Sequence, residues 1–341
     1  MLRSTAQILL IALLSAAGFA CRDGGPGAPG GPPAEPAESS TPADAPAHDA
    51  AEPPLVRVLG TVQDGGFPHV ACRCERCVSA RTLDPPRRVA SLAIVLRDGR
   101  TFLIDATPDL PAQLQSLEDS FDPDASGVDR APVDGIFLTH AHMGHYLGLA
   151  HFGFEALNSP AIPTWGTPAM LEFLRSEAPW DQLVRFENLE LQVLIPDAAI
   201  ALDDDVRILP FRVPHRDEYA DTVGFIVEGP RGRVVYVPDS DRWAVWDPPL
   251  EARLEDGDTA LLDATFFSGE ELPGRDLEAI RHPFVRESLD RFGRGVREGR
   301  WSVWFTHLNH SNPALTDDSD ARRELEAAGF GVAREGQTFP L

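Results

Sequence analysis

The sequence contains no lysine, so arginine supplies all 30 basic residues, against 53 acidic ones. The formal net charge of −23 repels nucleic acids and anionic lipid headgroups at long range. We therefore expect no nucleic-acid partner. A bound metal ion would still attract an anionic small molecule, because the ion dominates the field around it.

Long apolar segments are also scarce at the N-terminus. The run Ile8–Leu14 is too short for a transmembrane helix. It follows the single charge of Arg3 and precedes small residues, which is the pattern of a secretory signal peptide. We expect residues 1–20 to be that peptide and Cys21 to carry a lipid, as in a lipoprotein facing the periplasm. The alternative is ordinary cleavage that leaves a free cysteine.

Residues 21–54 have almost no large hydrophobic side chains and consist mainly of Pro, Ala, Gly, Ser and acidic residues. Such a segment cannot offset the entropy cost of ordering, so we expect a disordered tether. Hydrophobic residues make up 43% of the chain, enough for a substantial core, and the folded domain is expected over residues 55–341.

Short apolar runs in this domain predict strands, and three amphipathic stretches predict helices over 168–176, 283–292 and 318–328. A further helix is expected from His145 to about Leu157. Strands dominate both halves, which favours an α/β fold of two facing sheets with outer helices. The predicted strands span 55–59, 91–96, 101–105, 135–139, 162–166, 189–194, 206–213, 222–228, 233–238, 259–263 and 302–306.

A histidine cluster directly follows the apolar run Gly135–Leu138, in the segment GIFLTHAHMGHYLGLAHFG. His140 and His142 point the same way in an extended chain, and His145 lies where a helix can begin. Sites in α/β proteins lie at such strand ends, and a catalytic zinc takes three protein ligands plus water. The spacing predicts a metal site, with surface or capping histidines as the alternative.

Cysteine is scarce, with four in the chain, yet three of them form the C-x-C-x₂-C pattern of Cys72, Cys74 and Cys77. Disulfides would leave one thiol unpaired and would be strained between such close neighbours. A structural zinc held by three cysteines and one histidine fits better. The fourth ligand is expected to be His310, or alternatively His69.

The segment THAHMGH resembles the HxHxDH signature of the metallo-β-lactamase superfamily. Four other segments follow in the family's order: FLIDATPD, RVPH, VVYVPDSD and VWFTHLNH. The resemblance implies an αββα sandwich with its metal site along the upper edges of two mixed sheets. It also implies roles for individual residues: one metal on His140, His142 and His215, a bridging Asp239, a second metal on His145 and His307, and a supporting Asp105.

Gly144 departs from this signature, because the family places there an aspartate that binds the second metal. The expectation is a second site that keeps only His145, His307 and the bridge, with lower affinity. Gly144→Asp is expected to raise that affinity if the loop has room for the side chain.

Three further segments, GTVQDGGFPHVACRCERC, DATPDLPAQL and HLNHSNP, resemble the pyrroloquinoline quinone biosynthesis protein B subgroup. The cysteine triplet and the H-x-x-H ending also resemble the phosphoribosyl cyclic phosphate phosphodiesterase, in which the last histidine joins the cysteines on zinc. The chain differs from the quinone-pathway proteins in its histidine-rich second motif and its signal-like start.

These patterns indicate a metallo-hydrolase in which metal-bound hydroxide attacks a small-molecule substrate, with a phosphodiester or cyclic ester as the class that the resemblance implies. Zn²⁺ is the expected metal, and Fe²⁺ or Mn²⁺ also suit the catalytic ligands. Asp105 and His145 are the candidate catalytic residues, and His145 is also a candidate metal ligand. The alternatives are an iron-dependent oxygenase of quinone-cofactor synthesis and a binding or carrier protein without turnover.

Overall fold

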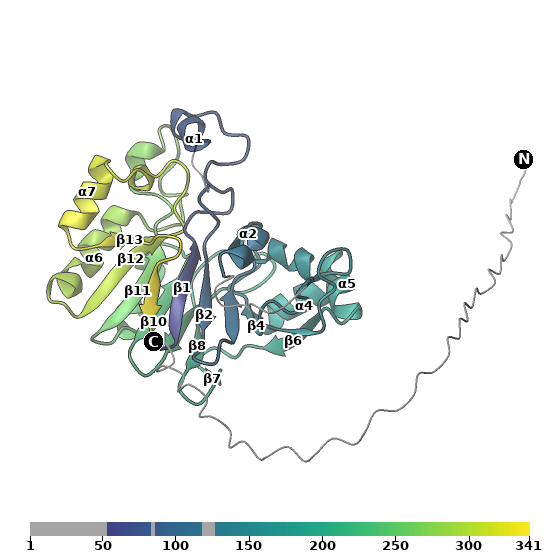
Figure 1. Cartoon of the computed structure of the whole chain (residues 1–341). Coiled ribbons are helices and arrows are strands. Elements are labelled where there is room, and N and C mark those ends of the chain that lie inside the picture. Colours follow the sequence, from purple (N-terminus) through teal and green to yellow (C-terminus); the bar gives the residue numbers. More distant parts are fainter. Residues whose placement is uncertain (1–52, 83–85, 118–126) are drawn as a thin grey trace, which may run out of the picture. The chain divides into compact units, whose positions relative to one another are not determined.

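The computed structural model describes residues 53–82, 86–117 and 127–341 (Figure 1). The expected signal peptide, the lipid-bearing Cys21 and the tether up to residue 52 lie outside the described residues. β1 begins at Leu55, where the sequence predicts the start of the folded domain. Among the described residues, no helix has the length and apolar composition needed to cross a bilayer.

The described residues form two seven-stranded sheets. In the first, the strands around β1 and β2 pair antiparallel, and those from β3 to β6 pair parallel. In order across the sheet, its strands are β14 (Thr338–Pro340), β1 (Leu55–Gly60), β2 (Ser91–Val95), β3 (Thr101–Ile104), β4 (Gly135–Phe137), β5 (Ile162–Gly166) and β6 (Leu189–Val193).

The second sheet also combines both kinds of pairing. The strands from β10 to β13 pair parallel, and those from β7 to β10 pair antiparallel. In order across the sheet, its strands are β13 (Gly331–Val332), β12 (Trp301–Thr306), β11 (Asp258–Asp263), β10 (Arg233–Val237), β9 (Val223–Glu228), β8 (Arg207–Arg212) and β7 (Ile200–Ala201).

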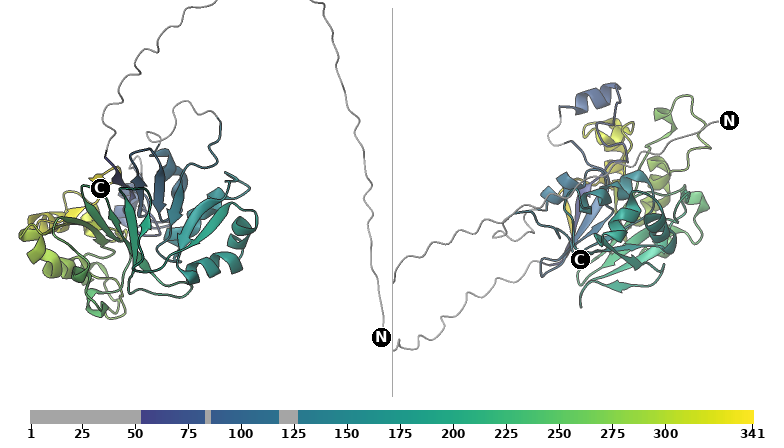
Figure 2. Two further views of the ribbon diagram at one scale, coloured as in Figure 1. Left: turned by 90° about the horizontal axis from the view of Figure 1, so that it is seen from below. Right: turned by 90° about the vertical axis from the view of Figure 1, so that its right-hand side faces the viewer.

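Helices cover the outer faces of both sheets, as the ribbons show from two further directions (Figure 2). The α-helices are α1 (Glu75–Ala80), α2 (Leu110–Gln115), α3 (Met143–Tyr146), α4 (Pro168–Ser176), α5 (Trp180–Arg185), α6 (Val285–Arg297) and α7 (Asp320–Ala327). Within the described ranges, the 3-10 helices are η2 (Leu147–Phe152), η3 (Trp243–Val245), η4 (Leu250–Ala252), η5 (Gly269–Glu271) and η6 (Pro313–Leu315).

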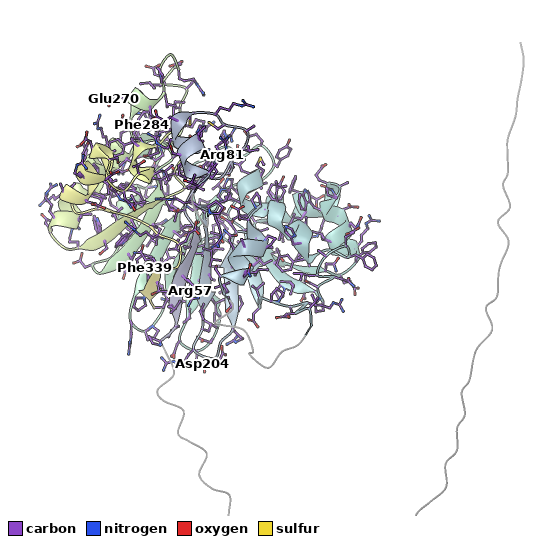
Figure 3. All side chains as sticks on the ribbon, turned by 45° about the horizontal axis from the view of Figure 1, so that its top comes forward. Arg57, Arg81, Asp204, Glu270, Phe284 and Phe339 are labelled. Carbon is purple, nitrogen blue, oxygen red and sulfur yellow. The ribbon has the colours of Figure 1, made fainter. Side chains whose placement is uncertain are left out.

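Strand alternation explains the layers, because successive side chains of a strand point to opposite faces. In β3, Phe102 and Ile104 enter the core between the sheets, whereas Leu103 packs in the core beneath α2, α4 and α5. Across the central core, the rings of Phe137 and Phe225 meet edge to face at 5.9 Å. Side chains fill these layers throughout, out to Phe339 at the β14 edge (Figure 3). The expected αββα sandwich is confirmed.

The helix expected from His145 to about Leu157 is present only in part and is not a continuous α-helix. α3 ends at Tyr146, and a 3-10 helix continues only to Phe152. Gly148 explains the change, because its backbone N–H donates to Ala106 O at 2.9 Å. A Cβ at Gly148 would lie 2.2 Å from Thr107 O. This close approach to the end of β3 replaces a regular α-helix.

Candidate functional site

The predicted site residues gather at one edge of both sheets, because each follows or closes a strand that runs toward that edge. β3 and β4 are parallel, as are β10, β11 and β12, while β8 is antiparallel to β9 and β9 to β10. Their carboxyl ends therefore lie together. The polar residues at or just beyond these ends are Asp105, His140, His215, Asp239, Asp263 and His307.

The first donor group consists of His140, His142, His215 and Asp239. His142 Nδ1 lies 2.8 Å from His140 Nε2 and 3.2 Å from His215 Nε2. Asp239 Oδ2 lies 3.1 Å, 3.4 Å and 3.8 Å from the nitrogens of His215, His140 and His142. Ligands about 2.0–2.1 Å from a tetrahedral zinc are separated by roughly 3.3 Å. These four residues therefore fit a metal ion.

Asp105 lies beneath the ligands, fully buried, and holds the histidine segment. Its Oδ1 accepts the backbone N–H of Thr139 at 2.8 Å, and its Oδ2 lies 2.7 Å from His145 Nδ1. The Thr139 hydroxyl contacts the same carboxylate and lies 2.9 Å from His140 Nδ1. With their Nδ1 atoms occupied, His140 and His145 present Nε2 to the site.

Two of the residues at this edge adopt left-handed backbone conformations, which residues other than glycine adopt rarely. Asp105 has φ 69° and His307 has φ 60°. Such conformations cost on the order of 1–3 kcal/mol and persist only where the surroundings enforce them. Here the Asp105 N–H donates to Phe137 O at 2.8 Å, so sheet contacts fix where the carboxylate points.

A second donor group faces the first and contains a residue that sequence reasoning missed. It consists of His145, His307 and Asp64, and Asp64 follows β1 in the segment TVQDGGFP. Asp64 Oδ1 lies 3.7 Å from His145 Nε2 and 3.9 Å from His307 Nε2. The expectation that only two histidines and the bridge surround this position is therefore wrong. The sequence contained one signal, because Asp64 stands directly before the two glycines of a turn. Asp64 is far from the histidines in sequence, however, so the signal did not connect it to them.

His282 is another site residue that the sequence analysis missed. Its Nδ1 lies 2.9 Å from Asp263 Oδ2 and 3.2 Å from Asp239 Oδ1. Asp263 is fully buried and also accepts the backbone N–H of Ser240 at 3.0 Å. The sequence offered one signal, Asp263 at the end of a predicted strand, a place similar to that of Asp239. His282 stands alone in a loop, and no pattern pointed to it.

The three cysteines form a separate group with His310. The Nδ1 of His310 lies 3.6 Å, 3.9 Å and 3.5 Å from the sulfurs of Cys72, Cys74 and Cys77. A tetrahedral zinc with Zn–S of about 2.3 Å and Zn–N of about 2.0 Å would separate S from N by roughly 3.5 Å. None of the three forms a disulfide. His69 lies beside the ring of His310 at 4.4 Å but is not a member of the group.

Comparison with known proteins places this site in a family. The profile of the Beta-lactamase superfamily domain matches residues 100–292, more than half of the chain. The chain belongs to the beta-lactamase superfamily. Its fold is the metallo-β-lactamase αββα sandwich, and its histidines and aspartates form groups that could hold metal ions, as in a metal-dependent enzyme.

Individual relatives share this superfamily fold. Coenzyme PQQ synthesis protein B of Methylobacterium sp. (strain 4-46) is 28% identical over 313 residues, covering 83% of this chain and 99% of that protein. The crystal structure of Zn²⁺-bound PqqB from Methylobacterium extorquens has a TM-score of 0.68 at 24% identity, covering 84% of this chain and 100% of that one. A diphosphatase from the PhnP family has a TM-score of 0.61 at 21% identity, covering 85% and 98%.

Charges in this beta-lactamase superfamily site centre on the buried Asp239. Burial opposes its ionisation, but the surrounding histidines outweigh burial and hold the pKa of Asp239 well below its usual range. Burial also opposes protonation of His215, yet Asp239 raises the pKa of His215 to about 9. Burial and the neighbouring His145 lower the pKa of His140. The field that attracts these protons also attracts a metal cation, so metal binding must displace protons.

The site opens past His142, whose side chain is 14% exposed, against 1% for His140. His142 Nε2 lies 3.2 Å from Glu218 Oε2 and 3.3 Å from Arg216 Nη2. The side chains of Arg216 and Glu218 are both 48% exposed. A substrate that approaches the metal ligands from this side therefore meets one cation and one anion.

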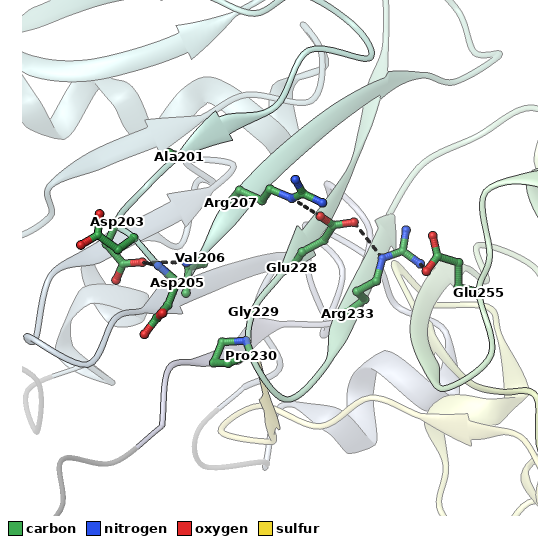
Figure 4. Close-up of a pocket in the computed structure, with 11 residues that line it drawn as sticks. Ala201, Asp203, Asp205, Val206, Arg207, Glu228, Gly229, Pro230, Arg233 and Glu255 are labelled. Atoms are coloured by element: carbon green, nitrogen blue, oxygen red, sulfur yellow. Dashed lines mark hydrogen bonds and ion pairs between the residues drawn. The ribbon is translucent and has the colours of Figure 1, made fainter.

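A cavity of about 630 Å³ lies elsewhere, at the starts of β8 and β10 (Figure 4). Arg207 and Arg233 both pair there with Glu228, and Arg233 also contacts Glu255. His215 and Asp239 of the first donor group follow the other ends of β8 and β10. This cavity is therefore separate from the donor groups.

Proposed function

We propose that the chain is a metal-dependent hydrolase of a small-molecule phosphodiester or cyclic ester. One observation carries the proposal: two largely buried donor groups face each other. Asp239 Oδ2 belongs to the first group and also lies 3.9 Å from His307 Nε2 of the second. Metal ions held there would supply Lewis acids and an activated water for in-line displacement. The PhnP-family diphosphatase among the fold neighbours agrees with this chemistry.

The surrounding side chains supply orientation and charge. Asp105 keeps the ring of His145 turned so that its Nε2 faces the site. Asp263 similarly fixes His282, whose ring centre lies 5.7 Å from that of His215 and 6.3 Å from that of His307. We infer that a proton on His282 serves the leaving group. Arg216, half-exposed beside His142 and paired with Glu218 at 3.4 Å, is the cation that an anionic substrate would meet there, in competition with Glu218.

A second candidate is an iron-dependent oxygenase step in quinone-cofactor synthesis. It is favoured by relatives named Coenzyme PQQ synthesis protein B, which match 83–84% of the chain. Imidazole and carboxylate ligands also suit non-haem iron. Export, which we propose from the signal-like residues 1–20 and the lipid on Cys21, counts against a role in a pathway expected in the cytoplasm.

Substrate turnover with defined metals distinguishes these functions. The purified protein would be loaded with Zn²⁺, Mn²⁺ or Fe²⁺ and assayed on a chromogenic phosphodiester, a cyclic phosphodiester and a lactam, with oxygen uptake recorded. We expect phosphodiester hydrolysis that His142→Ala abolishes. The matched control is His151→Ala, since His151 belongs to none of the donor groups. Oxygen uptake that requires Fe²⁺ would favour the oxygenase, and metal binding without turnover of any ester would favour a carrier.

A further inference from the structure

Asp64 and Gly144 compete for one place in the structure. A Cβ atom at Gly144 would lie 1.9 Å from Asp64 Oδ1 and 3.0 Å from Asp64 Cα. No side chain at position 144 fits while the Asp64 carboxylate stays where it is. The carboxylate therefore occupies the space beside His145 that a side chain at position 144 would otherwise enter.

We propose that Asp64 is the carboxylate ligand of the second metal ion, supplied from the loop after β1 in place of a side chain at position 144. The inference deepens the proposed function, because it concerns the same metal centre, but it holds whichever reaction that centre performs. It assigns Gly144 a positive role, since only glycine leaves room for Asp64.

Unpartnered buried atoms support this assignment. Asp64 Oδ1, His145 Nε2 and His307 Nε2 are each buried and without a hydrogen-bond partner. Buried polar atoms left without a partner destabilise a fold. They converge on one point, with Asp64 Oδ1 3.7 Å and 3.9 Å from the two nitrogens. A cation at that point satisfies all three at once.

The loop that carries Asp64 is held against the segment that carries His307. The backbone N–H of Gln63 donates to Leu308 O at 3.0 Å, and that of Leu308 donates to Thr61 O at 3.0 Å. The side chains of Gln63 and Asn309 are also hydrogen-bonded. Two residues on adjacent, paired backbones therefore reach the same point, which preorganises the pair for a metal ion.

The same two segments carry the cysteine site. Residues 72–77 follow Asp64 in one segment, and His310 follows His307 in the other. A metal on the cysteines would therefore cross-link the two segments that supply Asp64 and His307. The second donor group and the cysteine group are therefore joined by short stretches of the same two segments.

The test is a Zn²⁺ titration of the full chain with a competing chelator, in which the cysteine-bound equivalent is counted separately by thiol reactivity. We expect wild type to bind two further equivalents. Asp64→Asn keeps the shape but loses the charge, and should weaken one equivalent by more than about 100-fold, the upper end of the loss seen when only an outer-shell partner is removed. Asp98→Asn, in the exposed turn between β2 and β3, is the matched control.

The exchange of both positions provides the sharper test. Gly144→Asp alone should also weaken the second equivalent, because the two carboxylates collide. Asp64→Gly combined with Gly144→Asp should recover most of the lost affinity. Unchanged binding in Asp64→Asn, or a double variant weaker than both single variants in proteins with wild-type circular dichroism, would overturn the assignment. A wild type that binds both ions but hydrolyses no ester would overturn the proposed function and leave this assignment standing.

Discussion

Replacing Asp105 by asparagine tests how the second donor group is built. The carboxylate is fully buried and contacts the Thr139 N–H at 2.8 Å, the Thr139 hydroxyl at 2.9 Å and His145 Nδ1 at 2.7 Å. Asparagine has the same shape, but one of its two terminal groups is a donor. That donor must face either the Thr139 N–H or the His145 ring, and each of these needs an acceptor.

Two magnitudes follow from this geometry. A buried donor left without an acceptor costs about 1–3 kcal/mol, so the free energy of unfolding should fall by that amount. In wild type, the Asp105 carboxylate accepts a hydrogen bond from His145 Nδ1, which leaves Nε2 unprotonated and able to bind a metal. Without that acceptor, the His145 ring no longer favours this tautomer. Loss of such an outer-shell partner lowers metal affinity by about 10–100-fold. We expect that loss at the second position and little change at the first.

Asp258→Asn is the matched control, because Asp258 is also buried but starts β11, at the end of the strand away from the donor groups. It accepts the backbone N–H of Glu255 at 2.8 Å and pairs with Arg233 at 2.8 Å instead of contacting a histidine. Denaturant unfolding of the metal-free variants and Zn²⁺ titration of the folded ones give both quantities. Equal loss of the second metal in the two variants would refute the reasoning, because the effect would then follow from lost stability alone.

Four further predictions concern separate parts of the chain. Cys74→Ser should remove about one metal equivalent and lower the melting temperature, because a structural site contributes its binding energy to folding; metal analysis with thermal melting checks this. Because the pKa of His215 is raised to about 9 without metal, Zn²⁺ affinity of the first position should fall about tenfold for each pH unit below 9; buffer-dependent calorimetry should detect the released proton. His282→Ala should lower kcat at least about 100-fold. Because His282 also forms a possible metal-binding group with Asp239 and Asp263, metal analysis must accompany the assay, and loss of one equivalent would identify His282 as a ligand and not as a proton donor. Cys21→Ser should release the protein from the membrane fraction, and a wild type already wholly soluble would contradict lipidation.

The sequence was sufficient for the fold and for most of the first donor group. Strand alternation and the Asp-Gly turn after β2 are local, so short windows reveal them. His140 and His142 are two residues apart, so their convergence needed only an extended backbone. His215 and Asp239 could be added only because their segments, RVPH and VVYVPDSD, follow the order of the metallo-β-lactamase superfamily.

Only the tertiary structure revealed Asp64. It lies 80 residues before Gly144 in the sequence, and no local pattern joins them. Carboxylates at both positions would collide, and a chain with no carboxylate at either position would leave His145 and His307 without a charged partner. Which position carries the carboxylate therefore depends on atomic contacts between two segments that are distant in sequence. Taken alone, the sequence indicated a missing ligand at position 144. Packing of the loop after β1 against the segment after β12 decided that a carboxylate lies there, because those backbones pair and direct Asp64 into the gap that glycine leaves.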